Sequence, residues 1–371
     1  MKKVVFLEIL LLVLVIAAVA FFFWQTSMLQ PNAALDVPAA TQPAEPEPET
    51  EPAPAPEAED APEIEAVPVE ETEPVETLHV QDSWAEVLDG HDLTADEYFI
   101  YDLSADKYLL RSNAVDTKIY PASITKLFTA YVALLHADGN EEITVGDEIK
   151  LIDTDSSVAD LKVGDVLTVD QLVAAMLLPS GNDAAYALTT AVGRQLAEDP
   201  DMSAKAAMQR FVEQMNTDAE TLGLDNSHFT TPDGIHDEEH YIGMDDMVAI
   251  AKLVLANEVI ARYVASAEES VSAGEDRSLS WENTNLLLDE ESEYYSDQAV
   301  GLKTGYTTPA GYCVLSAVQI GERDLLIGVF GSEEKEVRFA DTLYLLARNF
   351  ALDIYEPVSY APADDVSNEA A

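Results

Sequence analysis

Pro121-Ala122-Ser123-Ile124-Thr125-Lys126 places a serine and a lysine three residues apart at the start of a predicted helix that continues through Leu135. Residues i and i+3 share one face of a helix, so the Lys126 amine can lie beside the Ser123 hydroxyl. The positive end of the helix dipole also favours a developing alkoxide at Ser123. A lysine can serve as the base for a serine only if burial or a second cation, such as Lys303, lowers its pKa. The stretch therefore predicts a nucleophilic serine.

Two further short patterns follow in the chain. Ser180-Gly181-Asn182 lies in a turn between two predicted helices, and Lys303-Thr304-Gly305 ends a predicted strand that continues into Tyr306-Thr307. Alone, each pattern is weak: Ser104-Ala105-Asp106-Lys107 also has a serine and a lysine three apart, but in a predicted hairpin turn. The three patterns in this order are the signature of penicillin-binding proteins and class A β-lactamases.

The fold class follows from the order of the predicted elements. Strands are predicted at both ends of the globular part and helices between them, which indicates an α+β fold. We expect one antiparallel sheet flanked by helices, with a helical subdomain inserted. The predicted strands cover residues 98–103, 107–111, 277–285, 300–304, 310–320 and 324–330. Besides the helix after Ser123, the predicted helices cover residues 169–178, 182–195, 204–222, 244–256 and 333–352.

With their flanking residues, the three patterns resemble a known family. The stretch from about Trp84 to Leu352, which also contains Pro232-Asp233-Gly234-Ile235-His236, is similar to the D-alanyl-D-alanine carboxypeptidases among the low-molecular-weight penicillin-binding proteins. The resemblance implies a serine β-lactamase/transpeptidase-like fold. It also implies removal of the terminal D-alanine from peptidoglycan stem pentapeptides through an acyl-enzyme, with β-lactam antibiotics as acylating inhibitors and no cofactor.

The resemblance assigns a role to each motif residue. Ser123 would be the acylated nucleophile, Lys126 its base, Ser180 the proton relay to the leaving D-alanine, and Asn182 the group that holds the peptide. Lys303 and Thr304 would bind the terminal carboxylate, beside Gly305. The backbone N–H groups of Ser123 and Tyr306 would form the oxyanion hole. Some relatives have an arginine where this chain has Thr284, so carboxylate binding should depend more on Lys303 and Thr304.

Three alternatives were weighed against this interpretation of the sequence. A serine β-lactamase would also need a carboxylate that activates the deacylating water. A catalytically silent module could bind muropeptides or β-lactams without turnover. His236 and His240 have the spacing of zinc-peptidase ligands, but Asp237 stands where that motif needs glutamate, and the preceding Pro232-Asp233-Gly234 indicates a turn. We therefore predict no metal site.

Charge and length limit the partners and the location of the protein. The net charge of the 371 residues is -51, which argues against nucleic acid as a partner. Cys313 is the only cysteine, so no intramolecular disulfide forms, and we expect it in a buried strand. Lys2 and Lys3 precede 16 uninterrupted apolar residues from Ile9 to Trp24. Residues 1–28 are therefore predicted to be a single-pass membrane anchor or, if cleaved, a signal segment, with the catalytic domain outside the cell membrane.

The remaining boundaries follow from composition. Residues 29–78 contain 14 acidic side chains and frequent prolines, which predicts a disordered Pro/Glu-rich linker over 29–79. Residues 80–356 would form the D,D-peptidase catalytic domain and residues 357–371 a disordered acidic tail. Many relatives continue into a small β domain and an amphipathic C-terminal helix. Only 66 residues follow Gly305 here, so we expect both to be absent and the N-terminal segment to provide the anchor.

Overall fold

The computed structural model describes residues 84, 87–113, 117–274 and 277–350. The predicted anchor at 1–28, the linker at 29–79 and the tail at 357–371 lie outside the described residues. Among the helices that are described, none combines the length and the apolar character needed to cross a bilayer.

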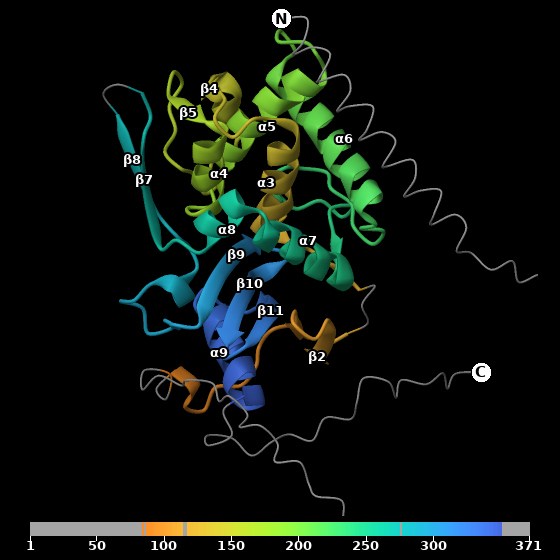
Figure 1. The fold of residues 1–371 in the computed structure, drawn as a ribbon, viewed down its shortest axis with the longest axis vertical. Helices are drawn as coiled ribbons and strands as arrows, with labels where there is room; N and C mark the ends of the chain where they lie inside the picture. Colours follow the sequence, from red (N-terminus) through yellow and green to blue (C-terminus); the bar gives the residue numbers. More distant parts are fainter. Residues whose placement is uncertain (1–83, 85–86, 114–116, 275–276, 351–371) are drawn as a thin grey trace, which may run out of the picture. The chain divides into compact units, whose positions relative to one another are not determined.

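Five antiparallel strands form the main sheet, in the order β2-β1-β11-β10-β9. The sheet joins the two ends of the globular part, because Glu97 at the start of β1 pairs with Phe330 near the end of β11. Strand β9 lies at one edge of the sheet, next to the helices (Figure 1). The strands are β1 Glu97–Asp102, β2 Lys107–Arg111, β9 Ala299–Thr307, β10 Gly311–Ile320 and β11 Arg323–Ser332.

Both faces of this sheet are buried. Successive side chains of a strand point to opposite faces, and β11 is apolar at consecutive positions for that reason. Leu325 and Ile327 pack against Phe339 of α9 (Val337–Phe350), whereas Leu326 and Phe330 belong to the core shared with the other helices. The sheet therefore separates a smaller core under α9 from a larger core within the helical region.

The helical region lies on the side of the sheet opposite α9 (Figure 1). Its central helix is α3, which contacts the five other helices of this region, α4 to α8. The helices are α3 Thr125–His136, α4 Val169–Leu177, α5 Asn182–Leu196, α6 Ala204–Leu222, α7 Met244–Ala256 and α8 Glu258–Val264, with short 3₁₀ turns η1 Ala122–Ile124, η2 Asp147–Leu151 and η3 Leu286–Leu288. Three two-stranded pairs complete it: β3 Lys118–Ile119 with β6 Ile242–Gly243, β4 Glu142–Thr144 with β5 Val166–Thr168, and β7 Glu268–Ser272 with β8 Ser278–Glu282.

The structure confirms the predicted α+β fold, with differences in detail. The helix α8 was not predicted, because it follows α7 after a single residue, Asn257, whose side chain caps it. Strand β7 was also missed, since its outward Glu and Ser side chains give it little apolar character. The last helix begins at Val337 and not at 333, because residues 333–336 form bends and turns.

Candidate active site

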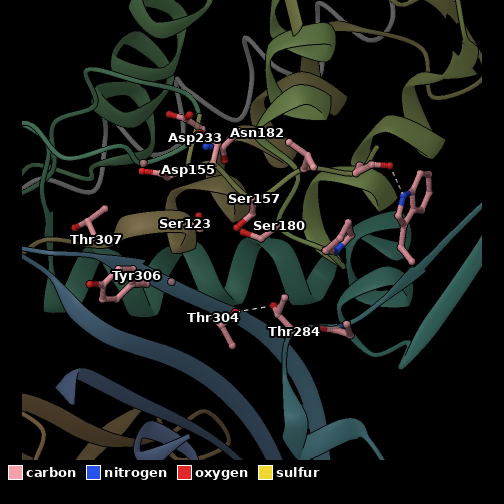
Figure 2. A pocket seen from close by; sticks show the side chains of 18 of the residues that line it. Ser123, Asp155, Ser157, Ser180, Asn182, Asp233, Thr284, Thr304, Tyr306 and Thr307 are labelled. Atoms are coloured by element: carbon pink, nitrogen blue, oxygen red, sulfur yellow. Dashed lines mark hydrogen bonds between the residues drawn. The ribbon is translucent and has the colours of Figure 1, made fainter. Parts of the chain in front are cut away.

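The three motifs meet in one cleft between the edge strand β9 and the helical region. The cleft has a volume of about 1250 Å³. The sequence-predicted residues that line it are Ser123, Ser180, Asn182, Thr304, Gly305 and Tyr306. Figure 2 shows the side chains of Ser180, Asn182, Thr304 and Tyr306 around Ser123. The two predicted lysines, Lys126 and Lys303, are fully or almost fully buried beneath this surface. The structure therefore brings together all eight residues that the sequence predicted for the site.

Ser123 and Lys126 are in direct contact. Ser123 lies in the 3₁₀ turn η1, which runs into α3, and the Lys126 Nζ donates to Ser123 Oγ at 2.8 Å. The same Nζ donates to the backbone oxygen of Asp233 at 2.8 Å. These two acceptors fix the Lys126 amine beside Ser123 Oγ, in a position to exchange a proton with the hydroxyl.

Burial is the main reason that Lys126 can act as a base. The side chain is fully buried, and this lowers its pKa to about 8, although the charges of Asp233 and Asp183 act in the opposite direction. About one Lys126 in ten is then neutral at pH 7, compared with fewer than one in a thousand for an ordinary lysine. The sequence suggested two causes for a lowered pKa of Lys126, which are burial and the nearby cation Lys303. Burial accounts for the lowered pKa, because a low dielectric disfavours the charged form.

Strand β9 carries the third motif along the opposite wall of the cleft. Lys303 Nζ donates to the backbone oxygen of Thr304 at 3.1 Å, and the hydroxyls of Thr304 and Thr284 share a hydrogen bond of 2.6 Å. Burial, with the charges of Lys126 and Arg338, lowers the pKa of Lys303 well below its ordinary value. A carboxylate that binds here would reverse this shift, since it favours the protonated amine.

Gly305 allows β9 to approach η1 closely. A Cβ at this position would lie 2.9 Å from the Pro121 oxygen and 3.0 Å from the Ser123 nitrogen. Any larger side chain would push the strand away from the serine. The glycine of the Lys-Thr-Gly motif is therefore explained by the spacing between the two walls of the cleft.

The second motif forms the turn between α4 and α5, as predicted. Ser180 and Asn182 are both largely buried, and Asp183 fixes the adjoining loop by accepting from Ala159 N at 2.7 Å and Leu161 N at 2.9 Å. Asn182 N donates to the Ser157 oxygen at 2.8 Å. The start of α5 and this loop therefore hold each other in place beside Ser123.

The backbone is strained at each of the three motifs. Ala122, Ser180 and Leu302 have φ values of 48°, 64° and 91°, in the left-handed region that side chains disfavour. Each of these residues either belongs to a motif or directly precedes it. Such strain persists only where the surrounding structure enforces it, and it concentrates at functional sites.

Of the two histidines, His240 has a structural role. His240 accepts at Nδ1 from Thr230 N at 3.1 Å, so its Nε2 carries the proton and donates to Thr125 Oγ1 at 2.8 Å. Burial lowers the pKa of His240 to about 4, which keeps the ring neutral. The segment 234–240 is a loop and not a helix, and within the described residues no group of three His, Cys, Asp or Glu side chains could hold a metal ion.

Sequence reasoning missed Arg338 at the start of α9. It is 4% exposed, lines the cleft, and donates from Nη1 to the oxygens of Gly305 at 3.2 Å and Cys313 at 3.4 Å. These bonds join α9 to β9 and to the adjacent strand β10. No local pattern marks this arginine, because its partners lie 33 and 25 residues away in the chain.

Gly234 offers a test of how tightly the site is packed. Its φ is +83°, and a Cβ would lie 1.9 Å from the Ala122 oxygen, next to Ser123. We expect Gly234→Ala to lower the melting temperature by more than about 5 °C and the acylation rate more than about tenfold. Gly223→Ala is the matched control, because Gly223 has a φ of +75° but no atom within 4 Å of its Cβ position. The control should lose only about 2–4 °C and keep its acylation rate. Equal losses in the two variants would contradict the tight packing.

Comparisons with known proteins agree with this site. The sequence pattern of the D-alanyl-D-alanine carboxypeptidase family of peptidases matches residues 84–334, which contain all three motifs. The chain belongs to this family. The predicted class of enzyme, a serine-type D-alanyl-D-alanine carboxypeptidase of the penicillin-binding kind, is thereby confirmed.

Individual relatives show how far the likeness extends. The D-alanyl-D-alanine carboxypeptidase of Streptomyces sp. (strain K15) is 33% identical over 252 residues, which cover 66% of this chain and 83% of that protein. The enzyme named DacF of Bacillus subtilis is 28% identical over 243 residues, covering 64% of this chain and 57% of its own length.

Solved structures also resemble this chain. The structure of the Streptomyces K15 DD-transpeptidase aligns with a TM-score of 0.63 and 30% sequence identity, and the alignment covers 70% of this chain and 98% of the transpeptidase chain. Penicillin binding protein 5 from Haemophilus influenzae has a TM-score of 0.58 at 25% identity and covers 70% of this chain and 72% of its own.

Proposed function

We propose that Ser123 attacks the carbonyl carbon of the penultimate D-alanine in a peptidoglycan stem pentapeptide. The new bond to Ser123 Oγ forms as the peptide bond to the terminal D-alanine breaks, and Lys126 takes the hydroxyl proton. Water then hydrolyses the ester and frees the serine. The observation that carries this proposal is the 2.8 Å contact between Lys126 Nζ, whose pKa is lowered, and Ser123 Oγ.

The other motif residues are assigned by their positions around Ser123. Ser180 returns the proton to the nitrogen of the leaving D-alanine, and Asn182 holds the substrate amide. Lys303 and Thr304 bind the terminal carboxylate. The backbone N–H groups of Ser123 and Tyr306 stabilise the oxyanion, and the close approach of the edge strand β9 to η1 supports this role.

Release of D-alanine is the direct test. The full chain is incubated with L-Ala-γ-D-Glu-L-Lys-D-Ala-D-Ala, and D-alanine is measured together with the rate at which a penicilloyl adduct is hydrolysed. We expect rapid release from the peptide and slow hydrolysis of the adduct, and amidation of the peptide's terminal carboxylate should greatly reduce turnover. Rapid penicillin hydrolysis with an untouched peptide would indicate a β-lactamase. Adduct formation with no turnover of any peptide would indicate a silent binding module.

The pKa of Lys126 predicts how acylation depends on pH. The neutral amine is the active form, and it is lost as the pH falls below about 8. Acylation by penicillin should therefore rise about tenfold per pH unit below pH 8 and level off above it. Because the Asp233 charge raises this pKa, Asp233→Asn should move the rise to lower pH. Asp155→Asn, the control, should leave it in place, and a flat profile between pH 6 and 9 would mean that Lys126 is not the base.

The protein is further proposed to act at the outer face of the cell membrane, held by residues 1–28. Lys2, Lys3 and the 16 apolar residues that end at Trp24 support this placement. Cell fractionation should find the full-length mass in membranes, and a chain that starts at residue 80 should be released from them. A mature protein that begins near Leu35 and is free in the medium would show that the segment is a cleaved signal.

A further inference from the structure

Thr284 joins the two walls of the cleft on the side where the terminal carboxylate is proposed to bind. Its backbone N–H donates to the Leu178 oxygen at 3.1 Å, just before the second motif. Its hydroxyl shares a 2.6 Å hydrogen bond with the hydroxyl of Thr304 in the third motif. Both threonines line the cleft, and Figure 2 shows this bond as a dashed line. One residue therefore connects the helical region with strand β9.

The residues on both sides of Thr284 fix its position. Asn283 Nδ2 donates to the Ser266 oxygen at 2.9 Å. Asn285 is fully buried, and its backbone N–H donates to Asn283 Oδ1 at 3.0 Å. A segment that is already held by hydrogen bonds therefore presents the Thr284 hydroxyl to Thr304. Little conformational freedom remains to be lost when the two hydroxyls bond.

The number of protons in the hydroxyl pair determines the direction of its bond when a carboxylate binds. Each hydroxyl has one proton to donate, and the geometry of the pair allows either oxygen to be the donor. An ionised carboxylate can only accept hydrogen bonds. Thr304 must then give its proton to the carboxylate, so the proton between the two threonines must come from Thr284.

We propose that Thr284 is a positioning residue that turns the Thr304 hydroxyl proton toward the terminal carboxylate of the substrate. This inference rests on the proposed function, because it takes Thr304 as a ligand of that carboxylate. Hydrogen bonds that run in one direction strengthen each other, and a bond to a charged acceptor is stronger than a bond to a neutral one. Thr284 therefore favours peptides with a free terminal carboxylate over peptides whose end is uncharged.

A purely structural role for Thr284 would have a different consequence. If the hydroxyl pair only held the two walls together, its loss would disturb the whole cleft around Ser123, and every peptide would be turned over more slowly. If Thr284 orients the Thr304 proton, the loss affects mainly substrates with a charged end. Peptides that differ only in that end therefore separate the two roles.

Two matched peptides and a nearly isosteric substitution test the inference. Nα,Nε-diacetyl-L-Lys-D-Ala-D-Ala ends in a carboxylate, and its C-terminal amide has the same length without the charge. In Thr284→Val, which removes the hydroxyl and keeps the shape, we expect kcat/KM to fall about tenfold for the carboxylate peptide and less than about twofold for the amide. Thr284→Ser, which keeps the hydroxyl, should leave the ratio of the two kcat/KM values within about twofold of the wild type.

A double variant tests whether Thr284 acts through Thr304. Adding Thr284→Val to Thr304→Val should lower kcat/KM for the carboxylate peptide by less than about twofold further, because the hydroxyl that Thr284 orients is already absent. Ser280→Ala is the control variant. Ser280 also lines the cleft, but its hydroxyl bonds to that of Ser270 at 2.9 Å within the hairpin of β7 and β8. The control should leave both kcat/KM values unchanged.

Equal losses for the two peptides in Thr284→Val would overturn this inference, and so would losses that multiply in the double variant. If the valine variant does not fold, Thr284→Ala should show the same change in the ratio, and failure of both to fold would assign the hydroxyl a structural role and overturn the inference. These outcomes leave the proposed function standing. If the wild type released no D-alanine from the carboxylate peptide, the proposed function would be wrong, and this inference with it.

Discussion

Replacing Ser123 with alanine is expected to abolish covalent labelling by a fluorescent penicillin, a loss of at least about 10⁴-fold. Ser123 carries the hydroxyl in the cleft that has the base, Lys126 Nζ, at 2.8 Å. Without the hydroxyl there is no oxygen to form the ester, whatever the rest of the site contributes to binding. The fold should persist, because the substitution removes one oxygen at the surface of the cleft.

Ser104→Ala is the matched control for this variant. Ser104 and Lys107 repeat the spacing of Ser123 and Lys126, but they flank the turn between β1 and β2, where Ser104 Oγ accepts from Asp324 N at 3.1 Å. This variant should label as well as the wild type. Labelling that survives Ser123→Ala, with the modified peptide located by mass spectrometry, would show that another residue is the nucleophile.

The difference between these two serines shows what the sequence could determine. The same spacing occurs twice, and only the secondary structure separates the cases: a 3₁₀ turn leading into a helix at Ser123, and a hairpin turn at Ser104. That secondary structure was predictable, because two short runs rich in apolar residues flank Ser104-Ala105-Asp106, whereas residues 127–135 of α3 are apolar except for Thr129. The main helices and strands were predicted for the same reason.

Features that depend on distant partners could not be predicted in this way. The pKa of Lys126 depends on how deeply the packed helices bury it, and Asp233 reaches it only because the chain returns 107 residues later. Arg338 likewise enters the site from the last helix. The Asp183 carboxylate accepts hydrogen bonds from the backbone N–H groups of residues 159 and 161. Such backbone contacts leave no pattern in the sequence. Local patterns therefore give the chemical groups of the site, and the tertiary contacts determine their ionisation and position.

Lys126→Arg should have the second largest effect, lowering acylation by about three orders of magnitude or more. The substitution keeps a positive charge and hydrogen-bond donors near Ser123 Oγ and the Asp233 oxygen. An arginine stays protonated at every pH at which the protein is folded, so it cannot accept the hydroxyl proton. The experiment thus separates loss of the base from loss of the charge. The rate constant for penicillin acylation, from pH 6 to 9, is the measurement.

Lys126→Met complements this variant, because a fully buried amine is replaced by an apolar chain of similar size. Desolvating a charged group costs free energy, so the methionine variant should fold and melt within a few degrees of the wild type. It should be as inactive as Lys126→Arg. Two folded variants, one charged and one neutral, that share the same defect would assign that defect to proton transfer. Near-normal acylation in folded Lys126→Arg would place the base elsewhere in the cleft, since the guanidinium cannot perform that step.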